Sequence, residues 1–247
     1  MKRASIAVAF ALSLCAGTGC RTAGTSVKAG ASAPATPTAL HWVRTSAEFR
    51  AAATQTYRAA TRRIEVVGAS MPPGTWAVSL DADDTVLDNS LYAKERMDAH
   101  KAYTPESWRA WVARRAAVPI PGSAQFMRRV KEMGGSIVIV TNRTMAECPD
   151  TEENFRALEL PFDLMLCRPD GAPPDKMPRY EAVVKGTARE GMRPLEIVAW
   201  VGDNIQDFPL LAQADRKSGE NAFAEFGVRF YIIPNPVYGS WEKNPVE

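Results

Sequence analysis

The stretch "WAVSLDADDTVLDNS" at residues 76–90 places four aspartates directly behind a short apolar run. These are Asp81, Asp83, Asp84 and Asp88. Like charges this close repel one another, and a carboxylate that is buried alone pays a large desolvation penalty. The crowding therefore indicates that a positive partner or a chemical task holds these side chains together.

An apolar run that ends in polar residues occurs three times along the chain. The runs are 76–80, which ends at Asp81, 137–140, which ends at Thr141, and 197–201, which ends at Gly202-Asp203. Continuous apolar runs are typical of strands that are covered on both faces of a parallel sheet. Ligands bind beyond the carboxyl ends of such strands. The three runs therefore predict one site at one edge of a sheet.

Helical patterns separate these runs. We expect helices over about 46–64, 123–133, 151–160 and 179–190, and a further strand over 230–233. Thr45 followed by Glu48 predicts a capping box at the start of the first helix. Alternation of strand and helix predicts an α/β fold with a doubly wound parallel sheet.

Composition bounds the function. The chain has 247 residues, of which 46% are hydrophobic and 23% charged, and this fits one globular domain of good size. The net charge of +2 gives no electrostatic case for a nucleic-acid polymer as partner. The sequence contains only two histidines, so a mechanism with a histidine nucleophile and a histidine acid has little to draw on.

The first 40 residues are expected to lie outside the fold. A basic start, a short apolar segment and small residues before Cys20 resemble a lipoprotein signal over 1–20, with Cys20 as the lipidated residue. A plain secretory signal cut nearby is the alternative. Residues 21–40 are rich in Ala, Gly, Ser, Thr and Pro, which predicts a flexible tether. We expect export, membrane attachment through the lipid, and a folded domain over 41–247.

Two cysteines remain in that domain, Cys148 and Cys167. Export makes a disulfide between them chemically feasible. Of the two interpretations, we favour unpaired, half-buried thiols.

Four interpretations of the aspartate cluster compete. A solvated acidic loop is the plainest. A calcium loop of the EF-hand type fails, because its glycine and its last carboxylate would fall on Val86 and Tyr92. A glycosidase needs two carboxylates across a sugar cleft, for which the sequence gives no specific sign. A phosphoryl-transfer site explains the crowding, because Mg²⁺ takes oxygen ligands and offsets their repulsion.

In that last interpretation the residues take distinct roles. Asp81 would bind the metal and attack phosphorus, which forms an aspartyl-phosphate. Asp83 would protonate the leaving oxygen and later activate water. Thr141 and a lysine would stabilise charge on the phosphoryl oxygens, and Asp203 would complete the metal site.

Three motifs together resemble the haloacid dehalogenase (HAD) superfamily. They are Asp81-Ala82-Asp83-Asp84-Thr85, Thr141 behind its strand, and the stretch "GDNIQD" at 202–207. The stretches "LDNS", "TNR", "VGDN..DF" and "PNPVYGSWE" narrow the resemblance to class C non-specific acid phosphatases, which are typically exported bacterial lipoproteins. The resemblance covers about residues 76–242.

The resemblance implies a HAD-like Rossmannoid core with a small helical cap at about 90–120. It implies that Asp81 is the nucleophile and Asp83 the acid/base, whose backbone carbonyl also binds Mg²⁺. It makes Asp203 a metal ligand and Asp207 a carboxylate that orients the site. Thr141 would bind phosphate with Asn142 beside it.

The resemblance also implies a phosphate-binding lysine and an aromatic clamp. Lys176 matches the family pattern better than its rival Lys185. Trp108 and Tyr238 lie where family members hold the base or ring of the substrate, and stacking on a nucleobase is worth about 1–3 kcal/mol. Core packing is the alternative for both, since Trp111 follows Trp108 on the same helical face.

The expected function is therefore Mg²⁺-dependent hydrolysis of small phosphomonoesters, with nucleoside 5′-monophosphates and aryl phosphates as substrates. One alternative is a non-catalytic surface lipoprotein that binds a nucleotide or cofactor. Another is a phosphotransferase that uses the same site and passes phosphate to an alcohol. A homodimer is left open, and we expect the protein on the periplasmic or cell-surface side of a bacterial membrane.

Overall fold

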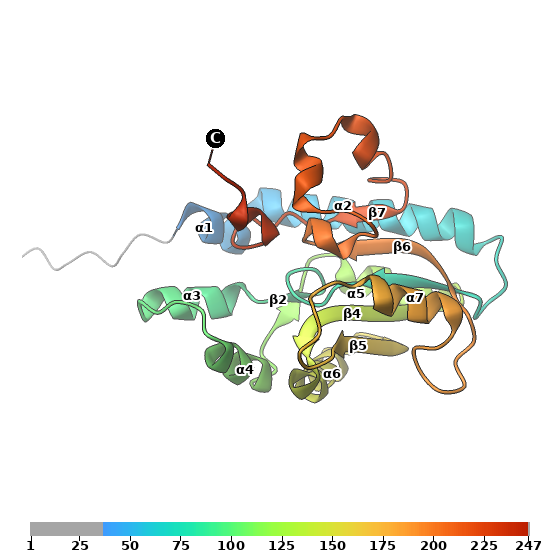
Figure 1. Cartoon of the computed structure of the whole chain (residues 1–247), viewed down its shortest axis with the longest axis horizontal. Helices are drawn as coiled ribbons and strands as arrows, with labels where there is room; N and C mark the ends of the chain where they lie inside the picture. Colours follow the sequence, from blue (N-terminus) through green and yellow to red (C-terminus); the bar gives the residue numbers. More distant parts are fainter. Residues whose placement is uncertain (1–36, 247) are drawn as a thin grey trace, which may run out of the picture. The chain divides into compact units, whose positions relative to one another are not determined.

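The computed structural model describes residues 37–246, which lie in the unit that spans Ala35–Glu247. Five strands form one parallel sheet in the order β5-β4-β1-β6-β7 (Figure 1). The strands are β1 (Trp76–Leu80), β4 (Ser136–Thr144), β5 (Leu164–Arg168), β6 (Glu196–Gly202) and β7 (Phe230–Ile232). The predicted α/β fold with a parallel sheet is confirmed.

The register of the central strands brings the three predicted polar ends to one edge. Leu80 at the end of β1 lies opposite Ile139 of β4 and Val201 of β6. Asp81, Thr141 and Gly202-Asp203 follow these positions by one or two residues, so they lie close together at this edge.

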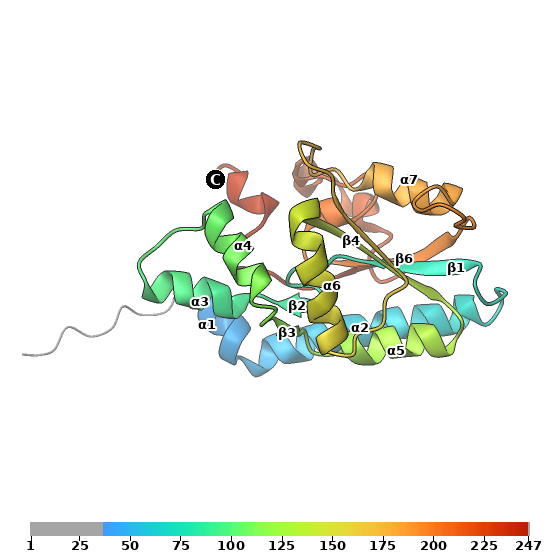
Figure 2. The same ribbon diagram turned by 90° about the horizontal axis from the view of Figure 1, so that it is seen from below.

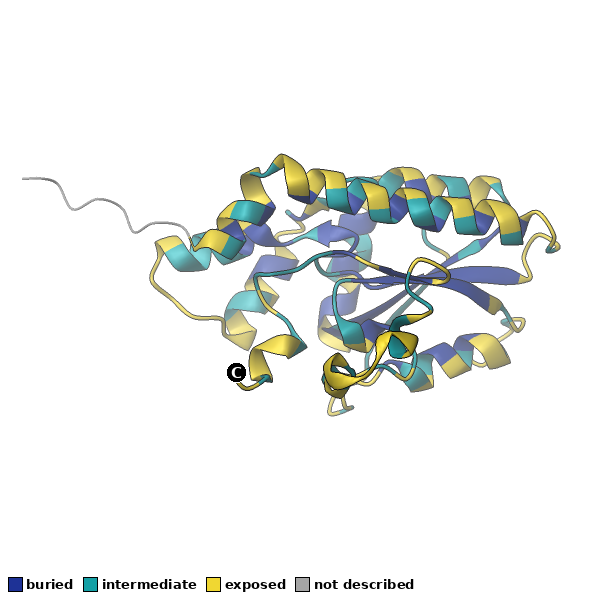
Figure 3. Cartoon of the chain, turned by 90° about the horizontal axis from the view of Figure 1, so that it is seen from above, coloured by how far each residue is buried: buried dark blue, intermediate teal, exposed yellow. Residues whose placement is uncertain are grey.

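Helices cover both faces of the sheet. Helices α2 (Ala47–Gly68) and α5 (Ser123–Glu132) cover one face, and α7 (Met177–Lys185) covers the other (Figure 2). Helix α6 (Cys148–Ala157) lies beside the edge strand β5. In Figure 3 the strands are almost wholly buried, whereas the outer faces of the helices are exposed. This is the burial that continuous apolar strands require.

Two more helices follow β1 within the predicted cap region. They are α3 (Ser90–Asp98) and α4 (Pro105–Ala113), and a small antiparallel pair, β2 (Leu87–Asp88) and β3 (Val118–Pro119), closes the insertion at its base. Thr104 caps α4, and its hydroxyl accepts a hydrogen bond from the amide of Ser107 at 3.2 Å.

The first predicted helix is longer than its pattern and starts differently. Its buried face is the expected one, with Phe49, Ala53, Tyr57, Ala60 and Ile64. The predicted cap at Thr45 is wrong, because the hydroxyl of Ser46 accepts the hydrogen bond from the amide of Phe49 at 3.0 Å. A short helix, α1 (Thr38–Thr45), precedes α2 and buries Leu40. The tether expected up to residue 40 therefore overlaps this helix.

Other boundaries also differ from the sequence-based expectation. Helix α7 begins earlier than predicted and ends at Lys185, where Gly186 caps it with a φ of 71°, a left-handed value that suits glycine. Helix α6 begins at Cys148, with Pro149 in its first turn, where a missing amide is tolerated. Strand β5 was not predicted, because "LMLCR" is short and only half buried at the sheet edge.

The two cysteines of the domain form a disulfide, so the expectation of unpaired thiols is wrong. The Cα atoms of Cys148 and Cys167 lie 6.0 Å apart. Pairing of Thr144 with Arg168 brings the start of α6 next to the end of β5. The sequence pattern did not reveal this, because β5 itself was missed.

Among residues 37–246, no helix is both long enough and apolar enough to cross a bilayer. Cys20 and the predicted signal lie outside the residues that the structure describes.

Candidate active site

A cavity of about 650 Å³ lies where the polar strand ends meet the cap. Its wall comes from the loop after β1, the cap helices, the end of β4, the start of α7, the loop after β6 and the C-terminal segment. The lining residues include Asp81, Asp83, Asn89, Tyr92, Tyr103, Trp108, Asn142, Arg143, Lys176, Asp203, Asp207 and Tyr238. Every site residue proposed from the sequence within the described residues therefore lines this cavity except Thr141.

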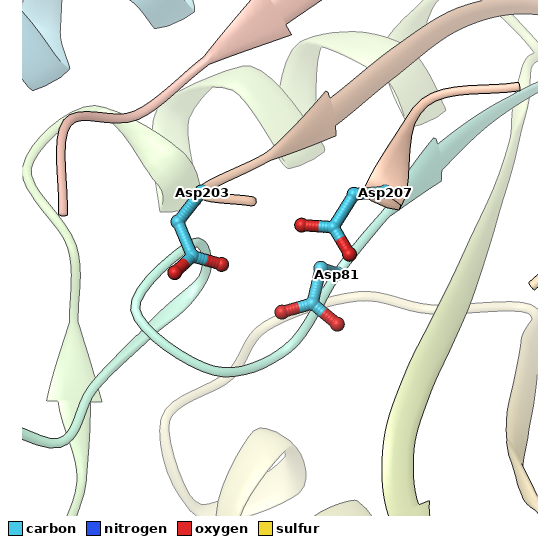
Figure 4. Close-up of side chains that lie close together, drawn as sticks. All are labelled: Asp81, Asp203 and Asp207. Atoms are coloured by element: carbon cyan, nitrogen blue, oxygen red, sulfur yellow. The ribbon is translucent and has the colours of Figure 1, made fainter. Parts of the chain in front are cut away.

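Three carboxylates converge at the floor of the cavity. Ligand oxygens of Asp81, Asp203 and Asp207 all lie within 4.8 Å of one another (Figure 4). Asp81 follows β1, whereas Asp203 and Asp207 come from the turn after β6. Gly202 allows that turn, because a Cβ there would lie 2.4 Å from the Cβ of Asp207.

Lys176 is the cation of this cluster. Its Nζ lies 2.5 Å from Oδ1 of Asp81 and 2.6 Å from Oδ1 of Asp207, and its side chain is 2% exposed. Burial alone lowers the pKa of Lys176, but Asp207 and Asp81 outweigh it and raise this pKa above its usual value. The rival Lys185 is exposed and pairs with Glu181 at 2.8 Å, so the structure brings only Lys176 to the site.

One lysine does not balance three carboxylates, of which Asp81 and Asp207 are buried and Asp203 is half-buried. Burial, with smaller contributions from Asp207 and Asp83, raises the pKa of Asp81 to about 7, although the attraction of Lys176 lowers it. Burial, with repulsion from Asp207 and Asp81, also raises the pKa of Asp203 well above its usual value. A divalent cation would relieve this repulsion, and carboxylate oxygens are the ligands that Mg²⁺ prefers. The residues present therefore fit a metal site.

Hydrogen bonds distinguish the roles of Asp207 and Asp81. Both oxygens of Asp207 are engaged, one by Lys176 and the other by the amide of Asn204 at 2.9 Å. Of the two Asp81 oxygens, only Oδ1 receives a hydrogen bond from a described residue. Oδ2 of Asp81 is thus available to a metal ion or to a substrate, whereas Asp207 is suited to hold Lys176.

Asp83 lies on another side of the cavity. Its carboxylate forms an ion pair with Arg143 at 2.7 Å and accepts a hydrogen bond from Nδ2 of Asn89 at 2.8 Å. Its side chain is 19% exposed, which leaves it accessible from the cavity. Its carboxylate is not part of the cluster formed by Asp81, Asp203 and Asp207.

Thr141 and Asn142 lie in the C-terminal half of β4, next to the cavity. Thr141 is fully buried, and its hydroxyl accepts a hydrogen bond from the amide of Arg143 at 3.1 Å. Asn142 lines the cavity, and its Oδ1 accepts a hydrogen bond from Arg179 at 2.7 Å. Arg179 also donates to the carbonyl of Thr141 and so fixes this end of the strand.

Aromatic side chains form the outer wall. Trp108 packs edge-on against Tyr92, with ring centroids 5.2 Å apart. The ring centroid of Tyr103 lies 6.4 Å from that of Trp108. Trp111 is instead buried in the core, so only Trp108 of the two indoles lines the cavity. Tyr238 lines the cavity, is 39% exposed, and donates a hydrogen bond from its hydroxyl to Asp84 at 2.5 Å.

Sequence reasoning missed several residues of the site. Arg143 was missed because it lies beyond the apolar run 137–140, whereas β4 in fact extends to Thr144 and so includes it. Asn89 and Asn235 lie in the stretches "LDNS" and "PNPVYGSWE", whose individual residues carry no pattern that marks them as site residues. Nδ2 of Asn235 donates a hydrogen bond to Oδ2 of Asp203 at 2.8 Å. The two residues are far apart in the sequence, so a local sequence pattern cannot predict this contact.

Comparison with known proteins agrees with this geometry. Residues 21–241 match the family described as HAD superfamily, subfamily IIIB (Acid phosphatase). The class C acid phosphatase from Bacillus anthracis with tungstate bound is 28% identical with a TM-score of 0.73, over 83% of this chain and 85% of that one. A second structure of the class C acid phosphatase from Bacillus anthracis gives a TM-score of 0.72 at the same identity and coverage.

Proposed function

Since this chain belongs to the acid phosphatases of HAD subfamily IIIB and is a phosphomonoester hydrolase, we propose that it requires Mg²⁺, forms an aspartyl-phosphate and is exported. The observation that carries this proposal is Asp81 in contact with Lys176 and within reach of Asp203. That arrangement combines a nucleophile, a fixed cation and a cluster of metal ligands in one cavity.

The first half of the proposed reaction transfers the phosphoryl group to the enzyme. Oδ2 of Asp81 attacks phosphorus, and the bond from phosphorus to the ester oxygen breaks. Asp83 gives its proton to that oxygen, so the alcohol leaves neutral. Lys176 holds Oδ1 of Asp81 and directs Oδ2 toward the substrate, and its charge offsets that of the phosphoryl oxygens.

The second half returns the enzyme to its starting state. A water molecule attacks the phosphorus of the aspartyl-phosphate, and Asp83 takes up its proton. The bond from phosphorus to Asp81 breaks, which releases inorganic phosphate and the free carboxylate. Asn142 of β4 lines the cavity and, with the buried Thr141 beside it, would hold the phosphoryl oxygens throughout.

Asp81, Asp203 and the backbone carbonyl of Asp83 would hold Mg²⁺, with Asp207 fixing Lys176 behind them. When bound, Mg²⁺ would neutralise charge on the phosphoryl oxygens. The donor set supports this choice, because it consists of oxygen atoms and contains neither histidine nor thiolate within the cluster.

The aromatic wall supports substrates with a flat ring, such as nucleoside 5′-monophosphates and aryl phosphates. Trp108 and Tyr238 come from the cap and the C-terminal segment, and both line the cavity that contains Asp81. The relative from Bacillus anthracis binds tungstate, a tetrahedral oxyanion like phosphate.

Export and anchoring through Cys20 rest on the signal-like start of the sequence. The disulfide between Cys148 and Cys167 supports export independently, because structural disulfides are typical of proteins outside the reducing cytosol. We place the protein on the periplasmic or cell-surface side of a membrane.

Phosphate release from p-nitrophenyl phosphate and adenosine monophosphate tests the proposed function. We expect release with Mg²⁺ and its loss in EDTA. Asp81→Asn should lower turnover by at least about 10³-fold because it removes the attacking oxygen. Asp98→Asn is the matched control, since Asp98 is exposed and, among residues 37–246, forms its ion pair with Lys94. Full activity of folded Asp81→Asn, or activity that persists in EDTA, would contradict the mechanism.

A further inference from the structure

Arg143 is a buried charged residue to which the mechanism above gives no task. It lies on β4 two residues after Thr141, and its side chain is 1% exposed. A buried guanidinium is retained only with several hydrogen-bond acceptors around it. The identity of those acceptors is therefore informative.

Most of the contacts of Arg143 lead to Asp83. Its Nε lies 3.0 Å from Oδ1 of Asp83, and its Nη2 lies 2.7 Å from the same atom. On its far side, Nη1 donates to the hydroxyl of Thr151 at 3.0 Å. That hydroxyl donates in turn to the carbonyl of Glu147 at 2.7 Å. Helix α6 thus holds Arg143, and Arg143 holds the carboxylate of Asp83 in one orientation.

Asn89 is a second support of the same carboxylate, and it leads to the cap. Its Nδ2 donates to Oδ1 of Asp83 at 2.8 Å, and its Oδ1 accepts from Nε1 of Trp111 at 2.8 Å. Trp111 lies on cap helix α4, as does Trp108, whose ring faces the guanidinium of Arg143 at 5.5 Å. Both supports of Asp83 therefore touch the same cap helix.

We propose that Arg143 is a positioning residue that, together with Asn89, aligns the carboxyl group of Asp83 for proton transfer, and that cap helix α4 sets this alignment through Trp111 and Trp108. The inference rests on the proposed function, in which Asp83 protonates the leaving oxygen. It adds that the helix that carries one wall of the substrate cavity also orients the acid.

The choice of leaving group separates this role from general support of the fold. An alkoxide is a poor leaving group and must be protonated as it departs, whereas p-nitrophenolate leaves readily without a proton. Misalignment of the acid should therefore slow ethyl phosphate far more than p-nitrophenyl phosphate. A loss of folded enzyme or of phosphate binding would slow both substrates equally. The parameter to compare is kcat/KM, because it reports on the steps up to cleavage of the ester bond.

The decisive variant is Arg143→Met, which keeps a long side chain but removes the donors. We expect its kcat/KM to fall about 10- to 100-fold more for ethyl phosphate than for p-nitrophenyl phosphate. Equal losses for the two substrates would overturn the inference. Arg114→Met is the matched control at the C-terminal end of α4, because Arg114 pairs with Glu95 and lies over Trp111, and its hydrogen bonds in the described structure reach neither Asp83 nor Asn89. It should show no dependence on the leaving group.

Asp83→Asn separates failure of this inference from failure of the proposed function. If Asp83→Asn shows the leaving-group dependence and Arg143→Met does not, only the role of Arg143 is wrong. If Asp83→Asn shows none, the proposed acid is wrong and the inference falls with it.

Trp111→Phe serves where Arg143→Met does not fold. It keeps the buried ring and removes only the Nε1 donor to Asn89. We expect an additional loss of about 3-fold for ethyl phosphate, and the same loss for both substrates would contradict a role of the cap in aligning the acid.

Discussion

At the scale of single residues, the site depends on a charge balance that Lys176 supplies. Its ammonium contacts two buried carboxylates, those of Asp81 and Asp207. Without this cation both carboxylates would be buried without a positive partner. An unpaired buried charge destabilises the folded state by several kcal/mol. The residue that would assist phosphoryl transfer is thus also needed for the stability of the empty site.

Lys176→Met should therefore destabilise the protein as well as inactivate it. We expect the free energy of unfolding, measured with urea in EDTA, to fall by about 3–5 kcal/mol. Lys185→Met is the matched control, because Lys185 is exposed at the far end of α7, the helix that follows Lys176, and its pair with Glu181 is worth less than about 1 kcal/mol. Similar effects of the two substitutions would show that the buried contacts of Lys176 carry no special stability.

At the scale of elements, the C-terminal segment over 234–244 fixes loops that come from distant strands. Asn235 binds Asp203, Tyr238 binds Asp84, and the hydroxyl of Ser240 donates to Asn204 at 2.7 Å. One stretch of chain thereby orients the turn after β6 and the loop after β1. Such partners of metal ligands tune metal affinity as strongly as many direct contacts do.

Asn235→Ala should weaken the binding of Mg²⁺ without unfolding the protein. Loss of the donor to Asp203 leaves that carboxylate free to rotate, so we expect the Mg²⁺ concentration for half-maximal binding to rise by about 10-fold. Isothermal titration calorimetry measures this directly. Asn244→Ala is the control in the same segment, since Asn244 contacts Gln213 and no site residue. Equal affinities of wild type and Asn235→Ala would contradict the role of the segment.

The disulfide links two other elements, the start of α6 and strand β5. It closes a loop with a sequence separation of 19, for which chain entropy predicts about 3 kcal/mol of stabilisation. The double variant Cys148→Ser, Cys167→Ser should lower Tm by about 6–12 °C. Dithiothreitol should lower the Tm of the wild type by a similar amount and leave the double variant unchanged. An unchanged wild type under full reduction would contradict this assignment.

At the scale of the whole molecule, the sequence was informative where a signal was local. The apolar runs before Asp81, Thr141 and Asp203 predicted three central strands and their common edge, because burial on both faces leaves a continuous apolar pattern. Lys176 followed from the resemblance, since its distance in sequence from Asp81 gives no sign that the two side chains touch. Strand β5 is short and only half buried, so no pattern marked it.

The contacts that complete the site join residues far apart in the sequence, and they produce no periodic pattern in the sequence from which they could be predicted. Arg143 with Asp83, Asn89 with Trp111, and Asn235 with Asp203 each join separate elements. Only the assembled fold shows that these polar residues are buried together. The disulfide was missed for the same reason, because pairing of β4 with β5 creates the proximity of its cysteines.

Repulsion within the acidic cluster should lower the stability of the whole protein when no metal is bound. Asp203→Asn tests this expectation. In EDTA, removal of one repelling carboxylate should leave the variant as stable as the wild type or more stable by about 1 kcal/mol. At Mg²⁺ concentrations near 100 times Kd, the wild type should gain about 2.7 kcal/mol, whereas the variant should gain far less. Urea unfolding with and without Mg²⁺ measures both quantities, with Asp98→Asn as an exposed control that should follow the wild type. An Asp203→Asn protein that is much less stable in EDTA and still gains full stabilisation from Mg²⁺ would contradict the assignment of Asp203 to the metal site. If instead the variant is at least as stable as the wild type in EDTA but less stable than it in Mg²⁺, the repulsion among these carboxylates is tolerated in the fold because the bound ion relieves it.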